Sequence, residues 1–307
     1  MKQFPLFLFF LSLVSGFTTG GSTIDSTKVE FRSDVPFLAE DRIEKMDLYL
    51  PRKRPPGETS PAILLIHGGG WKEGDKAQAR EMEFGTFFAE NGFVAASINY
   101  ALRTAGRFPI NLQDCKNGIR YLRTHAQKLG VDPDRIAVMG GSAGGHLALM
   151  VAYTADDPAF SPAQPYPGVS DRVKAVVDFY GITDIGGRKK TDADGKPTEL
   201  RGMNDEDKAV FGPDEQDWKK ASPISHIRRD VPPTLIVHGK KDTTVDRDQS
   251  QLLSEALKKV GAEVDLVWLQ KTGHSFSLRY EKPKDQKDPL EKNLEPVVLN
   301  FLKKHLR

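Results

Sequence analysis

Short apolar runs alternate with amphipathic segments along most of this chain of 307 residues. The apolar or β-branched runs predict buried strands at 62–66, 93–98, 135–139, 173–179, 233–238 and 263–269. Apolar residues at helical spacing predict helices over 76–91, 109–129, 248–260 and 295–306, and from 143 onward. Because strands and helices alternate, we expect a mostly parallel, doubly wound sheet with helices on both faces.

Two segments stand outside this alternation. Residues 43–50 alternate between apolar and polar side chains and predict a strand at the edge of the sheet. Residues 184–220 are polar and rich in Gly and Asp, and we interpret them as an insertion beside or over the functional site, with one short helix. Since the sequence has no internal repeat and no interdomain linker, residues 28–307 are predicted to form a single domain.

Composition and charge restrict the classes of partner. The chain is 38% hydrophobic and 28% charged, which is typical of a globular protein with a sizeable core. Its 44 basic and 42 acidic residues are interspersed, so neither a nucleic acid nor an anionic membrane is an expected partner. The one cysteine, Cys115, falls at helical spacing with Leu112 and Ile119, which predicts a packing role in the core.

The first residues have the layout of a secretory signal peptide. A short positive start precedes an apolar run from Phe4 to Val14, and small residues follow. The apolar run is too short to span a bilayer. We therefore predict a leader over residues 1–20, cleaved near Gly16 or Gly20, and a protein exported to the periplasm or the medium, without membrane contact after removal of the leader. The alternatives are a buried N-terminal strand and an uncleaved anchor.

A glycine-rich turn joins the strand at 135–139 to the helix that follows it. Gly140-Gly-Ser-Ala-Gly144 fits the G-x-S-x-G pattern of the nucleophile elbow, a signature of α/β-hydrolases. A chain that turns from strand to helix so sharply needs almost no side chain two residues before and after the corner. Ser142 at the corner would protrude at the carboxyl edge of the sheet as a candidate nucleophile. The alternatives are a phosphate-binding turn and a plain tight turn.

A serine nucleophile needs a base and an acid that orients the base. In a doubly wound sheet such residues lie just past the carboxyl ends of strands. Asp242 follows the strand at 233–238, and His274 follows the strand at 263–269. The order Ser142, Asp242, His274 is that of the α/β-hydrolases. Asp246 is the alternative acid, disfavoured because it lies farther from the end of its strand.

Six other histidines compete with His274 for the role of base, and the pattern assigns other positions to five of them. We expect His125 and His305 to face solvent on helices, and His226 to lie in a polar loop. We expect His238 to support the loop after its strand, and His146 to pack under the site.

Acyl transfer also requires fixed N–H groups that stabilise the oxyanion. Ala143, the first residue of the helix after Ser142, supplies one such donor. Gly69 and Gly70, in the run His67-Gly-Gly-Gly-Trp71 after the strand at 62–66, are the other predicted donors, because peptides without side chains turn their N–H groups freely. The Trp71 N–H is a further candidate, and its side chain is predicted to line the substrate pocket. This chemistry needs neither a metal nor a cofactor.

With these residues in place, the chain resembles α/β-hydrolase esterases of the bacterial feruloyl and acetylxylan esterase type. The resemblance covers roughly residues 30–306, and the hormone-sensitive-lipase-like and kynurenine formamidase groups are more distant relatives. It depends on six motifs that occur in order: His67-Gly-Gly-Gly-Trp71, Ser97-Ile-Asn-Tyr100, Phe108-Pro109 with Asp114-Cys-Lys116, Gly140-Gly-Ser-Ala-Gly-Gly-His146, His238-Gly-Lys-Lys-Asp242 and Gly273-His-Ser-Phe276. It implies that Ser142, Asp242 and His274 form the triad, and that the glycine-rich loop forms the oxyanion hole.

We therefore predict a serine esterase that works through an acyl-enzyme. The expected substrates are short-acyl or aryl esters, small or attached to plant polysaccharide, with acetyl or feruloyl as the acyl group. An amidase such as kynurenine formamidase, or a peptidase, is the alternative enzyme. A non-catalytic binding module on the same scaffold is disfavoured, because all three triad residues and both oxyanion segments are present.

Overall fold

The computed structural model describes residues 24–55, 57–103, 107–162, 164–278 and 293–307. The predicted leader, residues 1–20, lies outside these residues. The strands of the large sheet are β1 (Val29–Pro36), β2 (Lys45–Pro51), β3 (Ser60–Ile66), β4 (Val94–Ile98), β5 (Val131–Gly141), β6 (Ala175–Phe179), β9 (Thr234–Gly239) and β10 (Val264–Leu269). The helices around it are α1 (Ala79–Glu90), α2 (Ile110–Thr124), α3 (Ala126–Leu129), α4 (Ala143–Tyr153), α7 (Asp248–Val260) and α8 (Glu295–His305).

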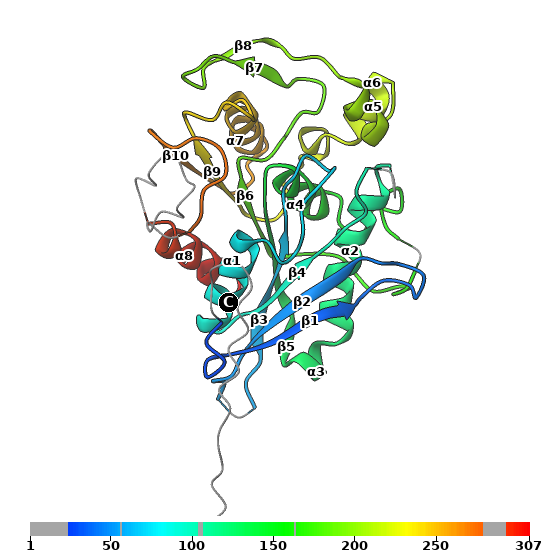
Figure 1. The fold of residues 1–307 in the computed structure, drawn as a ribbon, viewed down its shortest axis with the longest axis vertical. Helices are drawn as coiled ribbons and strands as arrows, with labels where there is room; N and C mark the ends of the chain where they lie inside the picture. The colour runs from blue at the N-terminus through cyan, green and yellow to red at the C-terminus, as the bar shows by residue number, and fades with distance from the viewer. Residues whose placement is uncertain (1–23, 56, 104–106, 163, 279–292) are drawn as a thin grey trace, which may run out of the picture.

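The strands pair in the order β1-β2-β4-β3-β5-β6-β9-β10 (Figure 1). Strands β3, β4, β5, β6, β9 and β10 are parallel, and β2 pairs antiparallel with both β1 and β4. After β3 the chain moves to one side, to β4, and then returns to place β5 on the other side of β3. Ligand sites in such sheets lie at this reversal, outside the carboxyl ends of the two strands. The fold therefore places its functional crevice beyond Ile66 and Gly140, which are register partners.

Each face of the sheet has its own hydrophobic core, as the alternation along β3 shows. Leu64 and Ile66 contribute to the core under α2, α4 and α7, whereas Ile63 and Leu65 contribute to the core under α1 and α8. Figure 1 shows α1 and α8 together on one side of the sheet and α2 on the other. Burial of both faces explains why the central strands are continuous apolar runs.

The predicted fold class is confirmed: a mostly parallel sheet lies between helices. Two predicted elements differ from the structure. Strand β2 is not at the edge, because β1 covers its outer side. The helix predicted over 109–129 is interrupted at His125, so α2 and α3 are separate, and Gly130 ends α3 in the left-handed conformation (φ 66°).

Cys115 is fully buried in α2, as predicted. Within the described ranges, no helix is long and apolar enough to cross a membrane.

Residues 184–220 contain more regular structure than the one short helix predicted. A two-stranded antiparallel sheet, β7 (Lys189–Thr191) and β8 (Pro197–Leu200), is followed by α5 (Asp205–Phe211) and α6 (Glu215–Lys220). The short 3-10 helix η1 (Pro223–His226) then leads to β9. In Figure 1 these elements gather at one end of the molecule, above α7. Asn204 caps α5 by accepting a hydrogen bond from the Asp207 N–H (2.8 Å), which favours helix formation in this polar stretch.

Candidate active site

Ser142 is the corner residue of a strained turn between β5 and α4. Its backbone has φ 57° and ψ −124°, a conformation that L-residues rarely adopt. A Cβ atom on Gly140 would lie 2.2 Å from the Gly144 carbonyl oxygen, and one on Gly144 would lie 2.1 Å from the Ile66 carbonyl oxygen. The helix therefore approaches both β5 and β3 so closely that only glycine fits. The Ser142 N–H donates to the Phe179 carbonyl (2.9 Å), which holds the corner against β6.

The glycine-rich loop after β3 lies beside this corner. Gly69 (φ 108°) and Gly70 (φ 62°) both have left-handed backbone, and the N–H groups of Lys72 and Glu73 close a turn on the Gly69 carbonyl (both 3.1 Å). Within the described residues, the N–H groups of Gly69 and Gly70 have no hydrogen-bond acceptor. Ala143, as the first residue of α4, has no acceptor within its helix. These are the three predicted oxyanion donors, and their N–H groups are free to receive an oxyanion.

His67 and Tyr100 hold the start of the glycine loop. His67 is fully buried, its ring stacks on Tyr100 with centroids 4.5 Å apart, and its Nδ1–H donates to the Gly68 carbonyl (2.7 Å). The Tyr100 hydroxyl donates to the His67 carbonyl (3.1 Å). Because these contacts restrict the peptides that precede Gly69, they fix the position from which the donor groups project.

Trp71 lines a cavity beside Ser142, and its indole also joins the glycine loop to α4. Its indole is only 3% exposed, and its N–H donates to Nδ1 of His146 (3.1 Å). Since an indole N–H only donates, His146 carries its proton on Nε2, which donates to the Ala221 carbonyl (2.6 Å). Burial lowers the pKa of His146 to about 4, so this neutral tautomer persists at neutral pH. The ring of Trp71 also packs edge-on against Phe211 of α5 (4.7 Å).

The predicted acid and base are brought together. His274 Nδ1–H donates to Oδ2 of Asp242 (2.6 Å), and the N–H groups of Thr244 and Val245 donate to Oδ1 (2.8 and 2.9 Å). Burial acts to raise the pKa of Asp242, but hydrogen bonds from His238 and His274 hold it well below its usual range. The acid is therefore a fixed carboxylate, which keeps Nε2 of His274 free to accept a proton. Asp246, the alternative acid, instead accepts the Lys189 N–H (2.8 Å).

Two residues of this site carry no signal in the sequence. Tyr180, at the end of β6, is fully buried and its ring lies 4.5 Å from that of His274, so it supports the base from behind. Arg80 of α1 donates to the Tyr180 hydroxyl and to Glu81. Both residues come from segments that were predicted only as strand and helix, and tertiary packing alone brings them to the site.

Two cavities share Ser142 in their walls. The larger, of about 520 Å³, is also lined by His274, Gly69 and Gly70. The smaller, of about 90 Å³, is lined by Trp71 and other residues, but His274 is not among them. Ser142 and His274, both within the described residues, are not hydrogen-bonded to each other, and such catalytic bonds commonly tighten only when substrate is bound.

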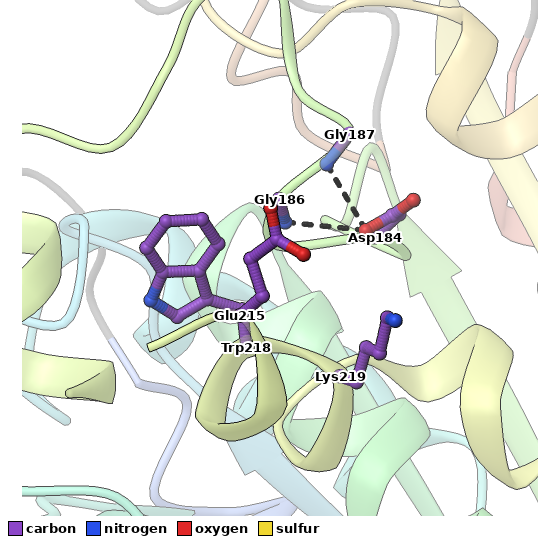
Figure 2. A pocket seen from close by; sticks show the side chains of 6 residues that line it. All are labelled: Asp184, Gly186, Gly187, Glu215, Trp218 and Lys219. Carbon is purple, nitrogen blue, oxygen red and sulfur yellow. Dashed lines mark hydrogen bonds between the residues drawn. The ribbon is translucent and has the colours of Figure 1, made fainter. Parts of the chain in front are cut away.

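A third pocket, of about 210 Å³, lies apart from these residues (Figure 2). Asp184, Glu215 and Lys219 surround it with polar groups, and Oδ1 of Asp184 accepts the N–H groups of Gly186 and Gly187 (3.1 and 3.0 Å). None of the predicted catalytic or oxyanion residues lines it, so it is separate from the site at Ser142.

Serine on an elbow, a histidine held by a buried carboxylate and free backbone donors are the groups that acyl transfer requires. Their placement beyond the carboxyl ends of β3, β5, β9 and β10 is the arrangement of the G-x-S-x-G hydrolases. The fold and this site define an α/β-hydrolase.

Comparison with known proteins identifies the family. The BD-FAE family profile matches residues 46–257, more than half of the chain. The chain therefore belongs to the BD-FAE family. Esterase LipQ of Mycobacterium tuberculosis is 32% identical over 252 residues, which cover 80% of this chain and 57% of LipQ. The probable carboxylic ester hydrolase LipM of the same organism is 34% identical over 225 residues, 72% of this chain and 50% of LipM. The chain thus spans about half the length of these curated relatives.

Solved structures agree on the fold. Esterase 2 of Thermogutta terrifontis, phosphoramylated by tabun, superposes with a TM-score of 0.71 at 26% identity, over 90% of this chain and 94% of that one. A truncated carbohydrate esterase from gut microbiota superposes with a TM-score of 0.76 over 92% of this chain and 98% of that one. At 24% identity, this second likeness supports the fold alone.

Gly144→Ala tests the tight elbow. The added Cβ would lie 2.1 Å from the Ile66 carbonyl oxygen, so we expect a loss of more than about 3 kcal/mol in the free energy of unfolding, measured by urea denaturation. Gly92→Ala is the matched control, since Gly92 has φ 86° and no atom within 4 Å of an added Cβ, and should cost only about 1–2 kcal/mol. Equal losses in the two variants would contradict the close packing inferred here.

Proposed function

We propose that this protein is a serine carboxylic-ester hydrolase. The observation that carries the proposal is the cavity shared by Ser142, on a strained elbow, and His274, held by Asp242, with the free N–H groups of Gly69 and Gly70 in the same wall. Membership of an esterase family and relatives with esterase names support it.

The reaction follows from these positions. His274 Nε2 takes the Ser142 proton as Oγ attacks the ester carbonyl carbon, and Asp242 stabilises the imidazolium that forms. Backbone N–H groups, including that of Ala143, receive the oxyanion; losing one such donor typically costs about 3 kcal/mol of barrier. The alcohol leaves with the proton from His274, and water, activated by the same histidine, releases the acid from Ser142.

The two cavities take the two parts of the ester. Because His274 protonates the leaving alcohol, the alcohol occupies the larger cavity, which His274 lines. Besides the catalytic groups, six polar side chains line that cavity: Lys72, Glu73, Gln78, Arg80, Thr244 and Ser275. Such donors and acceptors suit an alcohol rich in hydroxyl groups, such as a sugar residue, better than an aliphatic chain.

The acyl group then occupies the smaller cavity, where Trp71, Ile182 and Val245 lie next to Ser142. Polar and charged residues complete its wall: Arg188, Lys189, Arg201, Thr244 and Asp246. Its volume of about 90 Å³ can be compared with the cavity of about 150 Å³ that takes up benzene in another protein. A space of this size favours an acetyl group over the larger ring of a feruloyl group. Of the two acyl groups expected from the sequence, we therefore propose acetyl.

The proposed substrate is an acetyl ester of a carbohydrate hydroxyl. The polar larger cavity and the small acyl cavity support this class, and a predicted leader that exports the protein would bring it to extracellular polysaccharide.

Ser142→Ala tests the reaction. In a series of p-nitrophenyl esters from acetate to decanoate, with acetylated xylan and a ferulate ester alongside, the wild type should prefer acetate. Ser142→Ala should lower kcat/KM by more than about 10⁴-fold, because it removes the nucleophile, without a change in thermal stability. Hydrolysis that persists in folded Ser142→Ala, or a wild type that cleaves none of these esters, would refute the proposal.

Ile182→Ala tests the assignment of the acyl cavity. Enlarging the cavity should shift the preferred p-nitrophenyl ester from acetate toward butyrate or hexanoate, at a cost of about 2–5 kcal/mol in stability. Ile119→Ala is the matched control, since Ile119 is equally an isoleucine of the buried core but lines neither cavity. A chain-length profile that changes alike in both variants would place the acyl group elsewhere.

A further inference from the structure

The carboxylate of Asp242, which accepts three hydrogen bonds, also contacts a histidine outside the triad. Oδ1 accepts two backbone N–H groups, and Oδ2 accepts Nδ1–H of His274 at 2.6 Å. Nε2 of His238 also lies 3.2 Å from Oδ2. Both imidazoles therefore share one oxygen of a carboxylate that is itself fully buried.

The surroundings of His238 fix which of its nitrogens carries the proton toward Asp242. Nε2 faces only acceptors, the Asp242 carboxylate and the Val245 carbonyl (both 3.2 Å), so it bears hydrogen. Nδ1 lies 2.7 Å from Oγ of Ser250, whose hydroxyl is able to donate to it. His238 has no exposed surface, and Trp268 packs on its ring (5.9 Å between centroids). The ring is thus held with a donor aimed at the acid.

This donor acts on the catalytic base through the shared oxygen. An N–H group directed at Oδ2 withdraws negative charge from the atom that His274 contacts. The carboxylate then attracts the imidazolium form of His274 less strongly than a carboxylate without this contact would. We propose that His238 is a positioning residue that fixes Asp242 and sets the pH above which His274 acts as base. This proposal rests on the esterase reaction proposed above.

Other charged groups face the same histidines from neighbouring elements. In the described part of the chain, Asp178 on β6 and Asp246 in the loop after β9 face His238. Arg80 and Glu81 on α1 interact with Tyr180, whose ring packs on His274. Burial raises the pKa of Asp178 to about 7, against the opposing influence of His238. Since Asp178 titrates in the range where a histidine base does, a test of His238 has to exclude it.

The experiment compares His238→Leu, which removes both ring nitrogens, with His238→Gln, which keeps a side-chain N–H donor. The kcat/KM for p-nitrophenyl acetate is measured from pH 5 to 9, and the low-field proton NMR signal of the His274–Asp242 hydrogen bond is recorded. In His238→Leu we expect the acid limb of kcat/KM to move to higher pH by roughly half a unit or more, and the proton signal to move to lower field. In His238→Gln both should stay near the wild-type values.

Each contrary outcome has a defined meaning. An equal loss of rate at every pH in His238→Leu, with an unmoved proton signal, would make His238 merely structural and overturn the proposal.

The same comparison in an Asp178→Asn background should give the same shift in the acid limb of kcat/KM. A shift that vanishes in that background would belong to Asp178 and would overturn the proposal. If His238→Leu does not fold, Ser250→Ala, which frees Nδ1 of His238, should move the limb in the same direction, and an unmoved limb overturns the proposal. A wild type without esterase activity refutes the proposed function, while the NMR signal still tests His238.

Discussion

The close approach of α4 to β3 is the constraint on which the rest of the site depends. The backbone at Gly144 lies so near the Ile66 carbonyl that a methyl group does not fit, and the chain reaches this position only because Ser142 adopts a strained left-handed conformation. This contact places the serine, the first N–H groups of α4 and the loop that follows β3 at one point. Buried cores on both faces of the sheet supply the stability that offsets the strain.

From that point, buried polar contacts extend outward in two directions. On one side, Trp71 joins the oxyanion loop to His146 of α4, and His146 in turn holds the Ala221 carbonyl at the end of the 184–220 segment. On the other side, Asp242 joins His274 to His238. The first set of contacts makes the position of the proposed oxyanion donors depend on how the 184–220 segment packs. The second links His274, through the carboxylate that holds it, to a fully buried histidine.

Much of the fold and the site follows from local sequence pattern. The central strands could be predicted because burial on both faces makes them continuous apolar runs, and the elbow because close packing there demands glycine. Residues 28–50 have a strand-like pattern, but the place of β1 at the edge beside β2 could not be predicted. Only its first residue, Val29, is fully buried, so the strand carries little hydrophobic pattern. The break at His125 and the elements within 184–220 depend on local polar contacts that periodicity does not register. Three features arise only when distant segments pack together: the contact of His238 with Asp242, the packing of Tyr180 on His274 and the size of the proposed acyl cavity.

The most direct test of the account is the covalent labelling of Ser142 by paraoxon, an organophosphate that phosphorylates the structurally similar esterase 2 of Thermogutta terrifontis. The intact mass and the modified peptide are measured by mass spectrometry after reaction of the wild type and of Ser142→Ala. We expect one diethylphosphoryl group per chain, attached to Ser142, and none on the variant, since only the activated serine attacks the phosphorus and expels p-nitrophenolate. An adduct on another residue, or ester hydrolysis that continues in an unlabelled protein, would contradict the assignment of Ser142 as nucleophile.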